Sequence, residues 1–297
     1  MAARSEPGGM KPPGFTGAGL DRADRLRLDP EAVRALAASP DARLLRMQGL
    51  DPIAGEDSRL SWDCAGGDDA AALIFLGLNG KTPVFAPLPR LDGPRPNPRA
   101  VFGLLETMPA DEVALWGTAR SLIEWHNRHL FCGVCGSETR PFRGGWGRKC
   151  DSCRAEHFPR VDPVVIMLAE HEGRVLVGRQ PQYPPRRYSA LAGFLEPGES
   201  VEEAVARELH EEAGVTATSV RYVASQPWPF PGSLMLGCIA PVESDALNLD
   251  GEELEDAFWV ERSGVEAALA GDPQAPFKAP PPFAIAHTLF ERWLAGA

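Results

Sequence analysis

Hydrophobic and polar residues follow different patterns in different parts of the 297-residue chain. Up to about residue 128 the pattern is mixed, and it predicts a short helix at 29–39, a strand at 71–78 and an amphipathic helix at 111–126. After residue 161 the chain becomes strongly aliphatic and alternating. This region predicts strands at 164–170, 174–179, 188–194, 219–225, 233–240 and 255–260, and helices at 200–213 and 283–294.

The helix at 200–213 has the clearest predicted boundaries. Ser200 and Glu203 have the spacing of a capping box, and Gly214 provides the stop. Two proline-rich stretches, at 87–99 and 225–233, predict an extended loop and an irregular platform rather than regular structure. Residues 1–19 are rich in Gly and Pro and predict a disordered arm.

Composition narrows the class of protein. The chain has 30 Lys and Arg against 41 Asp and Glu, a net charge of −11, which argues against a protein that holds nucleic acid by covering its phosphates with basic residues. The start lacks a signal-peptide pattern, and the longest apolar run, residues 70–76, is far shorter than the roughly 20 residues of a membrane helix. We therefore expect a cytoplasmic protein with no membrane association.

Residues 129–160 contain almost no aliphatic side chains, so they need a source of stability other than an apolar core. They hold two C-x-x-C pairs, formed by Cys132, Cys135, Cys150 and Cys153. Two such pairs complete the tetrahedral shell of a structural Zn²⁺ and leave no open position for catalysis. The pattern predicts an N-terminal α+β domain at 20–128, a zinc ribbon at 129–160 and a further domain at 161–297.

Seven glutamates and one arginine, Arg207, occur between residues 196 and 212. Glu208, Glu211 and Glu212 have the i, i+3, i+4 spacing that places them on one patch of the helix, where like charges repel. Hard cations such as Mg²⁺ or Mn²⁺ prefer carboxylate oxygens, and one bound here could bridge to substrate phosphates and polarise a water. The usual alternative for such a run is a solvated charged face.

Residues 193–215 resemble the Nudix box, G-x5-E-x7-R-E-U-x-E-E-x-G-U, at every fixed position. The matching residues are Gly193, Glu199, Arg207, Glu208, Leu209, Glu211, Glu212, Gly214 and Val215. The resemblance implies an α/β/α sandwich that hydrolyses a nucleoside diphosphate linked to another group. It implies that the three helix glutamates bind divalent metals, with the backbone carbonyl of Ala192 as a further ligand. It also implies an ion pair between Glu199 and Arg207.

The segment SQPWPFPGS, residues 225–233, resembles the signature of the NADH pyrophosphatase family of Nudix hydrolases. Members of that family carry a four-cysteine zinc ribbon and an N-terminal domain before the Nudix domain. They cleave the pyrophosphate of NAD(H) to AMP and nicotinamide mononucleotide, and they remove NAD caps from RNA 5′ ends. The resemblance implies catalytic Mg²⁺ or Mn²⁺, structural Zn²⁺ and a homodimer.

The same resemblance assigns further residues. It implies substrate contacts from Phe158, Phe194, Gln226, Trp228, Ser233 and Ala286. Glu253, which has acidic neighbours at 252, 255 and 256, corresponds to a distal metal ligand or general base of the family. Phe158 stands where the family commonly has tyrosine, so the ring is kept but the hydroxyl is lost.

Two other functions are compatible with parts of the sequence. A Nudix hydrolase could act on ADP-ribose or another nucleotide conjugate, although the 225–233 segment argues against this. A nucleic-acid-binding module could use the basic residues of the ribbon, but that function leaves the Nudix box unexplained. These basic residues are Arg140, Arg143, Arg148, Lys149, Arg154 and Arg160. The choice among NADH, NAD⁺ and NAD-capped RNA as substrate stays open, as does the phosphorus that is attacked.

Overall fold

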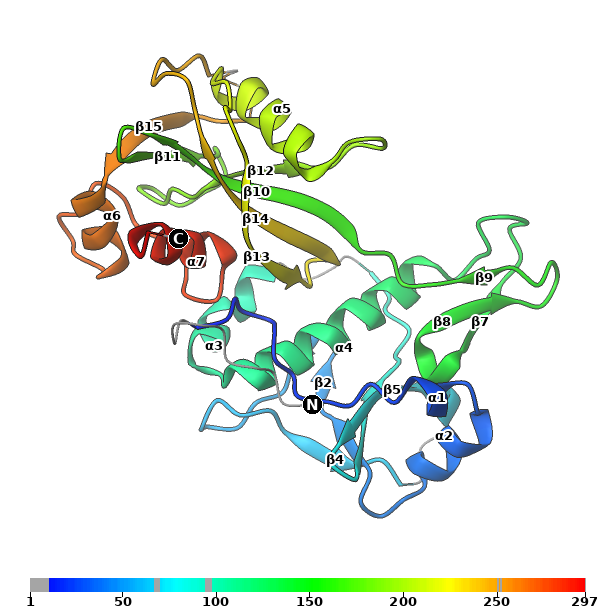
Figure 1. Cartoon of the computed structure of the whole chain (residues 1–297). Helices are drawn as coiled ribbons and strands as arrows, with labels where there is room; N and C mark the ends of the chain where they lie inside the picture. The colour runs from blue at the N-terminus through cyan, green and yellow to red at the C-terminus, as the bar shows by residue number, and fades with distance from the viewer. Residues whose placement is uncertain (1–10, 67–69, 94–97, 250, 252, 297) are drawn as a thin grey trace. The chain divides into compact units, whose positions relative to one another are not determined.

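The computed structural model describes residues 11–66, 70–93, 98–249, 251 and 253–296 (Figure 1). The chain forms two compact units. Among the described residues, unit 1 contains Phe15–Val161 and Trp228–Gly232, whereas unit 2 contains 11–14, Asp162–Pro227 and 233–296. The segment predicted as a zinc ribbon therefore lies in the same unit as the N-terminal domain. Within the described part of the chain, no helix is long and apolar enough to cross a membrane.

Unit 1 is built on a mixed four-stranded sheet with the order β4-β1-β6-β5, which packs against helix α2. Its helices are α1 (Asp24–Arg27), α2 (Pro30–Ala37), α3 (Phe102–Thr107) and α4 (Ala110–Arg128), with 3₁₀ turns η1 (Ala70–Ala72), η2 (Pro98–Val101) and η3 (Arg143–Gly145). Its first strands are β1 (Arg43–Leu45), β2 (Met47–Gln48), β3 (Asp51–Pro52), β4 (Trp62–Cys64), β5 (Leu73–Asn79) and β6 (Thr82–Pro87). The mixture of helices and sheet is the α+β organisation expected from the sequence.

Helix α4 is buried over most of its surface. Trp116 and Ile123 are fully buried, as an apolar face predicts, but Arg120 and Glu124 are also only 2% and 3% exposed. Burying a charge is costly unless it is paired and hydrogen-bonded. These two residues do lie within 3.8 Å of each other, between Arg120 Nη2 and Glu124 Oε2.

The ribbon of unit 1 is an antiparallel three-stranded sheet. It consists of β7 (Thr139–Phe142), β8 (Gly147–Cys150) and β9 (Glu156–His157). Gly147 faces Phe142 across the first hairpin, and a Cβ at this glycine would lie 2.3 Å from the phenyl ring. The hairpin therefore requires glycine at this position because no other residue leaves room for the ring.

Unit 2 contains a six-stranded sheet with the order β13-β14-β10-β11-β15, and β12 pairs with β10 beside this path. The strands are β10 (Asp162–His171), β11 (Arg174–Arg179), β12 (Leu191–Phe194), β13 (Arg221–Trp228), β14 (Ser233–Pro241) and β15 (Asp256–Glu261). The helices are α5 (Val201–Ala213), α6 (Arg262–Leu269) and α7 (Ile285–Leu294). The central strand β10 pairs in parallel with β14 along its whole length, and β12 and β11 share its other edge.

The sheet of unit 2 is covered on both faces. Val165 and Met167 of β10 pack with the apolar side of α5, whereas Ile166 and Leu168 pack with α6 and α7. Figure 1 shows α5 on one side of these strands and α6 and α7 on the other. Because side chains alternate along a strand, one aliphatic run supplies both cores. The predicted α/β/α sandwich is confirmed.

Three local predictions differ from the structure. Residues 11–19, assigned to a disordered arm, include Phe15, whose side chain is buried at 4% exposure. The rest of that arm lies outside the described residues. The strand expected at 188–194 begins only at Leu191. Strand β13 continues to Trp228 through the proline-rich segment. Proline has no N–H to donate, but β13 is an edge strand, where proline is tolerated. Helix α6 was not expected, and part of the 87–99 loop is not described.

Candidate active site

Helix α5 begins and ends where the sequence predicts. Ser200 Oγ accepts the Glu203 N–H at 3.2 Å, and the Glu203 carboxylate accepts the Ser200 N–H at 2.7 Å, so both bonds of the capping box are present. Gly214 ends the helix with a φ of 71°, in the left-handed region that favours glycine. Fixed at both ends, the helix holds its glutamates in one register against the sheet.

Gly193 of β12 lies directly against Glu208 of α5. A Cβ at residue 193 would lie 1.9 Å from Glu208 Cδ and 2.0 and 2.1 Å from its carboxylate oxygens. The φ of Gly193 is not in the left-handed region, so the glycine is needed for space rather than for its backbone conformation. Any other residue here would displace the Glu208 carboxylate.

Arg207 ties the loop before α5 to the helix. Its Nε donates to Glu199 Oε1 at 2.6 Å and its Nη2 to Glu199 Oε2 at 3.0 Å, a bidentate ion pair. Nη2 also donates to the carbonyl of Phe194 at 2.9 Å. Hydrogen bonds from Arg207 and from the Glu196 N–H lower the pKa of Glu199 to about 2. Glu199 therefore stays ionised at any physiological pH.

The carboxylates of α5 form a partly buried cluster. Glu208 is 7% exposed and Glu212 2%, whereas Glu211 is exposed. Arg207 Nη1 donates to Glu208 Oε1 and to Glu211 Oε2, both at 2.8 Å. Burial raises the pKa of Glu208 against the opposing effect of Arg207, and the negative charges of Glu211 and Glu253 add to the increase. Glu253 is thus close enough for its charge to act on Glu208.

This donor set fits a hard divalent cation. Glu199, Glu208, Glu211 and Glu212 bear four negative charges beside the single positive charge of Arg207. Buried carboxylates are costly without compensating charge, and Mg²⁺ or Mn²⁺ would supply it through oxygen ligands. The glutamate oxygens do not cluster as closely as the cysteine sulfurs do, and three of these side chains, Glu199, Glu208 and Glu211, pair with Arg207. A cation would compete with that guanidinium for their oxygens.

The predicted substrate-binding residues of unit 2 differ in accessibility. Phe194, at the end of β12, is 61% exposed, so its ring is open to stacking. Ser233, the first residue of β14, is 8% exposed. Ala286, in the first turn of α7, is 2% exposed and belongs to the apolar core. Ala192, whose carbonyl is a predicted metal ligand, lies in β12 opposite Ile166 of β10.

Gln226 is fully buried, and its amide joins three segments of unit 2. Its Nε2 donates to the carbonyls of Gly14 at 2.9 Å and Phe283 at 2.7 Å, and its Oε1 accepts the N–H of Ile285 at 2.8 Å. The Ile285 N–H is one of the first amides of α7, which have no acceptor inside the helix. Because both N–H donors of Gln226 are used, a substrate could bond to its amide only through the second lone pair of Oε1.

Trp228 belongs to unit 1, where it lies in a cluster of aromatic rings. Its ring centroid is 5.6 Å from Phe15, 6.2 Å from Phe102 and 5.0 Å from Phe230, each with edge-on geometry. Phe15 could not be predicted as part of this cluster, since a single phenylalanine in a Gly- and Pro-rich stretch has no periodicity. Its burial depends on the tertiary structure alone.

Phe158 also belongs to unit 1, near the ribbon. It is 51% exposed, and its ring lies 5.9 Å from that of Phe142. The Arg143 guanidinium is 5.7 Å from the centroid of the Phe158 ring. This arrangement leaves much of the ring open to a second stacking partner.

The four ribbon cysteines form the cluster that the sequence predicts. Their Sγ atoms lie within 4.8 Å of one another, with Cys132 and Cys153 at 3.6 Å and Cys135 and Cys150 at 3.5 Å. Four sulfurs around a Zn²⁺ at 2.3 Å would be separated by about 3.8 Å, so the spacing fits tetrahedral Zn²⁺. Among the described residues no other group of potential ligands is this compact.

Most basic residues of the ribbon are neutralised or buried. Arg140 lies 2.8 Å from Asp151, Lys149 lies 3.1 Å from Glu156, and Arg143 lies 3.0 Å from Asp24. Arg148 is 5% exposed. A carboxylate therefore lies beside three of the six basic side chains, so the surface of the ribbon is less positive than its sequence suggests.

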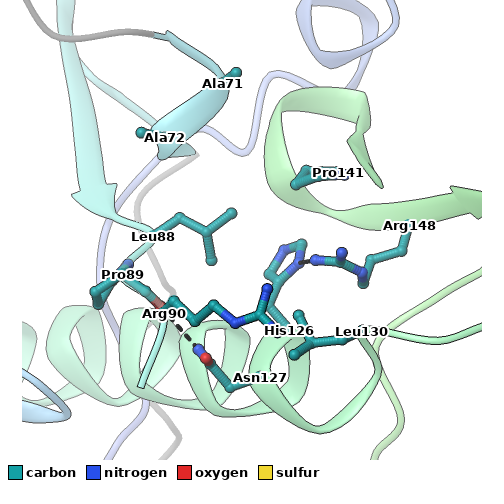
Figure 2. A pocket seen from close by; sticks show the side chains of 10 residues that line it. All are labelled: Ala71, Ala72, Leu88, Pro89, Arg90, His126, Asn127, Leu130, Pro141 and Arg148. Atoms are coloured by element: carbon teal, nitrogen blue, oxygen red, sulfur yellow. Dashed lines mark hydrogen bonds between the residues drawn. The ribbon is translucent and has the colours of Figure 1, made fainter. Parts of the chain in front are cut away.

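A pocket of about 310 Å³ in unit 1 lies where helix α4 meets the ribbon (Figure 2). Arg148 donates from Nε to Thr139 Oγ1 at 2.7 Å and from Nη1 to His126 Nδ1 at 3.1 Å, so His126 Nε2 carries the proton that it shares with the Gly145 carbonyl. Burial lowers the pKa of His126 to about 4, which keeps the ring neutral. Figure 2 shows Asn127 bonded to the carbonyl of Pro89. The hydrogen bonds that line the pocket join α4 to the ribbon.

Two domain families match parts of this chain. Residues 159–279 match the NUDIX domain, and residues 127–158 match the NADH pyrophosphatase zinc ribbon domain. The sandwich of unit 2, with the glutamates of α5 against β12, is therefore a Nudix hydrolase fold, and the cysteine cluster is its zinc ribbon.

Three relatives extend the match beyond these domains. The NAD-capped RNA hydrolase NudC of Mycobacterium bovis strain BCG is 38% identical over 294 residues, which cover 93% of each chain. The human NAD-capped RNA hydrolase NUDT12 is 40% identical over 262 residues, 85% of this chain and 54% of the human protein. Nudix hydrolase 19 of Arabidopsis thaliana is 42% identical over 228 residues, 62% of this chain and 52% of the plant protein. The chain belongs to this family of zinc-ribbon Nudix hydrolases, although it spans only about half the length of the human and plant relatives.

Proposed function

We propose that the protein hydrolyses the pyrophosphate bond of NAD(H), giving AMP and nicotinamide mononucleotide, and removes NAD caps from RNA 5′ ends. The observation that carries this proposal is the carboxylate cluster of α5, with buried Glu208 and Glu212 held against Gly193. The relatives named NAD-capped RNA hydrolases support the choice of substrate.

Glu208, Glu211, Glu212 and Glu253 would hold the catalytic cations, with the Ala192 carbonyl as a further ligand, and Mg²⁺ or Mn²⁺ is the proposed metal. Such ions, when bound, offset the negative charge of the pyrophosphate and lower the pKa of a coordinated water. Arg207 and Glu199 hold the loop before α5 against the helix that carries the cluster. A glutamate of the cluster accepts the proton of the attacking water as general base.

Recognition of the nicotinamide or adenine ring is assigned to exposed aromatic side chains. Phe194 and Phe158 are 61% and 51% exposed, and each presents a ring face for stacking. Trp228 packs nearly perpendicular to Phe15 and Phe230, at interplanar angles of 84° and 65°, and is the third proposed stacking residue. Ser233, Gln226 and Ala286 complete the proposed substrate-binding set.

Substitution of Glu212 tests the proposal. Glu212→Gln keeps the shape of the side chain but removes its charge, so turnover of NADH with Mn²⁺ should fall by at least about 100-fold. The matched control is Glu202→Gln in the first turn of the same helix, whose carboxylate is exposed and outside the cluster. Zinc content and circular dichroism should be unchanged in both. Near-normal turnover by Glu212→Gln would contradict the metal assignment.

The substrate is decided by parallel assays. NAD⁺, NADH, NAD-capped RNA and ADP-ribose are compared by kcat/KM, and a preference for ADP-ribose would replace the proposed activity by the alternative Nudix reaction. Size-exclusion chromatography with light scattering tests the proposed homodimer, and a cytoplasmic location stays a prediction.

A further inference from the structure

The proline-rich segment leaves the Nudix sheet for the other unit. Pro227 and Ser233 belong to unit 2, but Trp228–Gly232 between them belongs to unit 1. We call Trp228–Gly232 the aromatic loop. The part of the segment that carries the aromatic rings therefore packs within unit 1. Residues of unit 1 hold that loop in position.

Arg120 of α4 binds the aromatic loop directly. Its Nε donates to the carbonyl of Pro229 at 2.9 Å, and its guanidinium lies 4.7 Å from the ring centroid of Phe230. Pro229 is buried, and Arg120 is 2% exposed, so water does not compete for these contacts. A charge-assisted hydrogen bond and a desolvated cation–π contact are each stronger than their exposed counterparts.

The other side of the same guanidinium is fixed to the body of unit 1. Nη1 donates to the Leu50 carbonyl at 3.3 Å and lies 3.5 Å from the Asp51 carboxylate, and Nη2 lies 3.8 Å from Glu124. Trp116 Nε1 donates to the same Leu50 carbonyl at 3.0 Å. The two carboxylates compensate the buried charge, and the shared acceptor fixes the position of the guanidinium.

These contacts use the planar fork that distinguishes arginine from lysine. One rigid group reaches Pro229 from Nε and Leu50 from Nη1, which point in different directions. A lysine at this position would keep the positive charge between Asp51 and Glu124, but a single ammonium cannot satisfy both carbonyls in this geometry.

We propose that Arg120 is a positioning residue for the hydrolysis: by holding the aromatic loop within unit 1, it sets the position of Trp228. This inference rests on the proposed function, in which Trp228 contacts the substrate. It assigns a task to the N-terminal domain, which the sequence alone leaves without one.

Arg120→Lys tests the clamp with the buried charge retained. Because the loop should lose its anchor while the glutamate cluster is untouched, KM for NADH should rise about tenfold with kcat within about threefold of wild type. Hydrogen exchange without substrate, at the amides of Trp228, Phe230 and Gly232, should become about tenfold faster, while amides of β5 keep their rates.

Arg59→Lys is the matched control, the same change of side chain elsewhere in unit 1. Arg59 Nη1 lies 2.9 Å from Glu112 of helix α4, so the substitution alters an ion pair of that helix without changing a partner of Arg120. KM and the loop exchange rates should stay within about twofold of wild type.

Two results would overturn the inference. One is wild-type KM and loop exchange in Arg120→Lys, and the other is equal acceleration of loop exchange in both variants, which would make Arg120 a general stabilising residue. A wild-type protein that does not hydrolyse NADH would refute the proposed function instead. In that case the exchange measurement, which needs no turnover, still decides whether Arg120 fixes the loop.

Discussion

At the scale of single residues, the site depends on close approaches that leave no room for change. Gly193 is needed because the Glu208 carboxylate occupies the space where a side chain would begin. Glu199 and Arg207 are needed because their bidentate pair joins the loop to helix α5, which carries the proposed metal ligands. Each of these residues affects the site by fixing the position of another side chain.

Gly193→Ala should therefore impair turnover through Glu208. The new methyl group would overlap the carboxylate, so NADH hydrolysis should fall by at least about 100-fold, with zinc content and secondary structure retained. Steady-state kinetics and circular dichroism check this. The control is Gly103→Ala in α3, where a Cβ meets nothing within 4 Å and where alanine should stabilise the helix by about 0.5–1 kcal/mol. Full activity of Gly193→Ala would show that the Glu208 carboxylate can move without harm.

At the scale of elements, the ribbon and helix α5 are stabilised in different ways. Helix α5 has a capping box, a glycine stop and an apolar face in the core of unit 2. The ribbon has three short strands around four clustered thiols, so its stability should come largely from Zn²⁺.

Cys153→Ser should accordingly remove the metal and unfold the ribbon locally. Zinc bound per chain should fall from about one to near zero, and amides of β7 and β8 should lose protection from hydrogen exchange. Cys64→Ser is the control, because Cys64 is an exposed thiol outside the cluster. Retention of a full equivalent of zinc by Cys153→Ser would rule out the four-cysteine site.

At the scale of the whole molecule, the charge distribution favours a site for cations on α5 over a broad surface for nucleic acid. The net charge is −11, and part of it is concentrated in the carboxylates of α5, the proposed cation site. The ribbon cations that could have attracted RNA are largely paired with carboxylates of the same unit. The protein should thus recognise the NAD moiety of a capped RNA rather than the RNA chain.

Salt dependence tests this division. Raising KCl from 50 to 200 mM should lower kcat/KM for NAD-capped RNA by less than about 20-fold, because fewer than about three phosphates should be contacted. Free NAD⁺, assayed at the same salt concentrations, corrects for effects on chemistry and on the catalytic metal. A decrease of a thousandfold for the RNA alone would indicate an extended phosphate-binding surface.

Local features explain which parts could be predicted from the sequence. The capping box, the glycine stop and the C-x-x-C pairs act over a few residues, so their spacing was sufficient to place α5 and the ribbon. The run of residues 164–170 predicts β10 because a strand buried on both faces is apolar throughout. The start of β12 and the extent of β13 were not predictable, because strand ends depend on which neighbour pairs with them.

Helix α5, the cysteine cluster and the family follow from the sequence without the fold, because each depends on residue types at fixed spacing along one segment. Tertiary structure alone decided that Phe15 is buried, that Gln226 is used up in holding Gly14, Phe283 and Ile285, and that Arg120 clamps the aromatic loop. These contacts join residues about 60 to more than 200 positions apart. No periodicity or local motif encodes such a pairing, since it arises only when the chain has folded and the buried polar groups have found their partners.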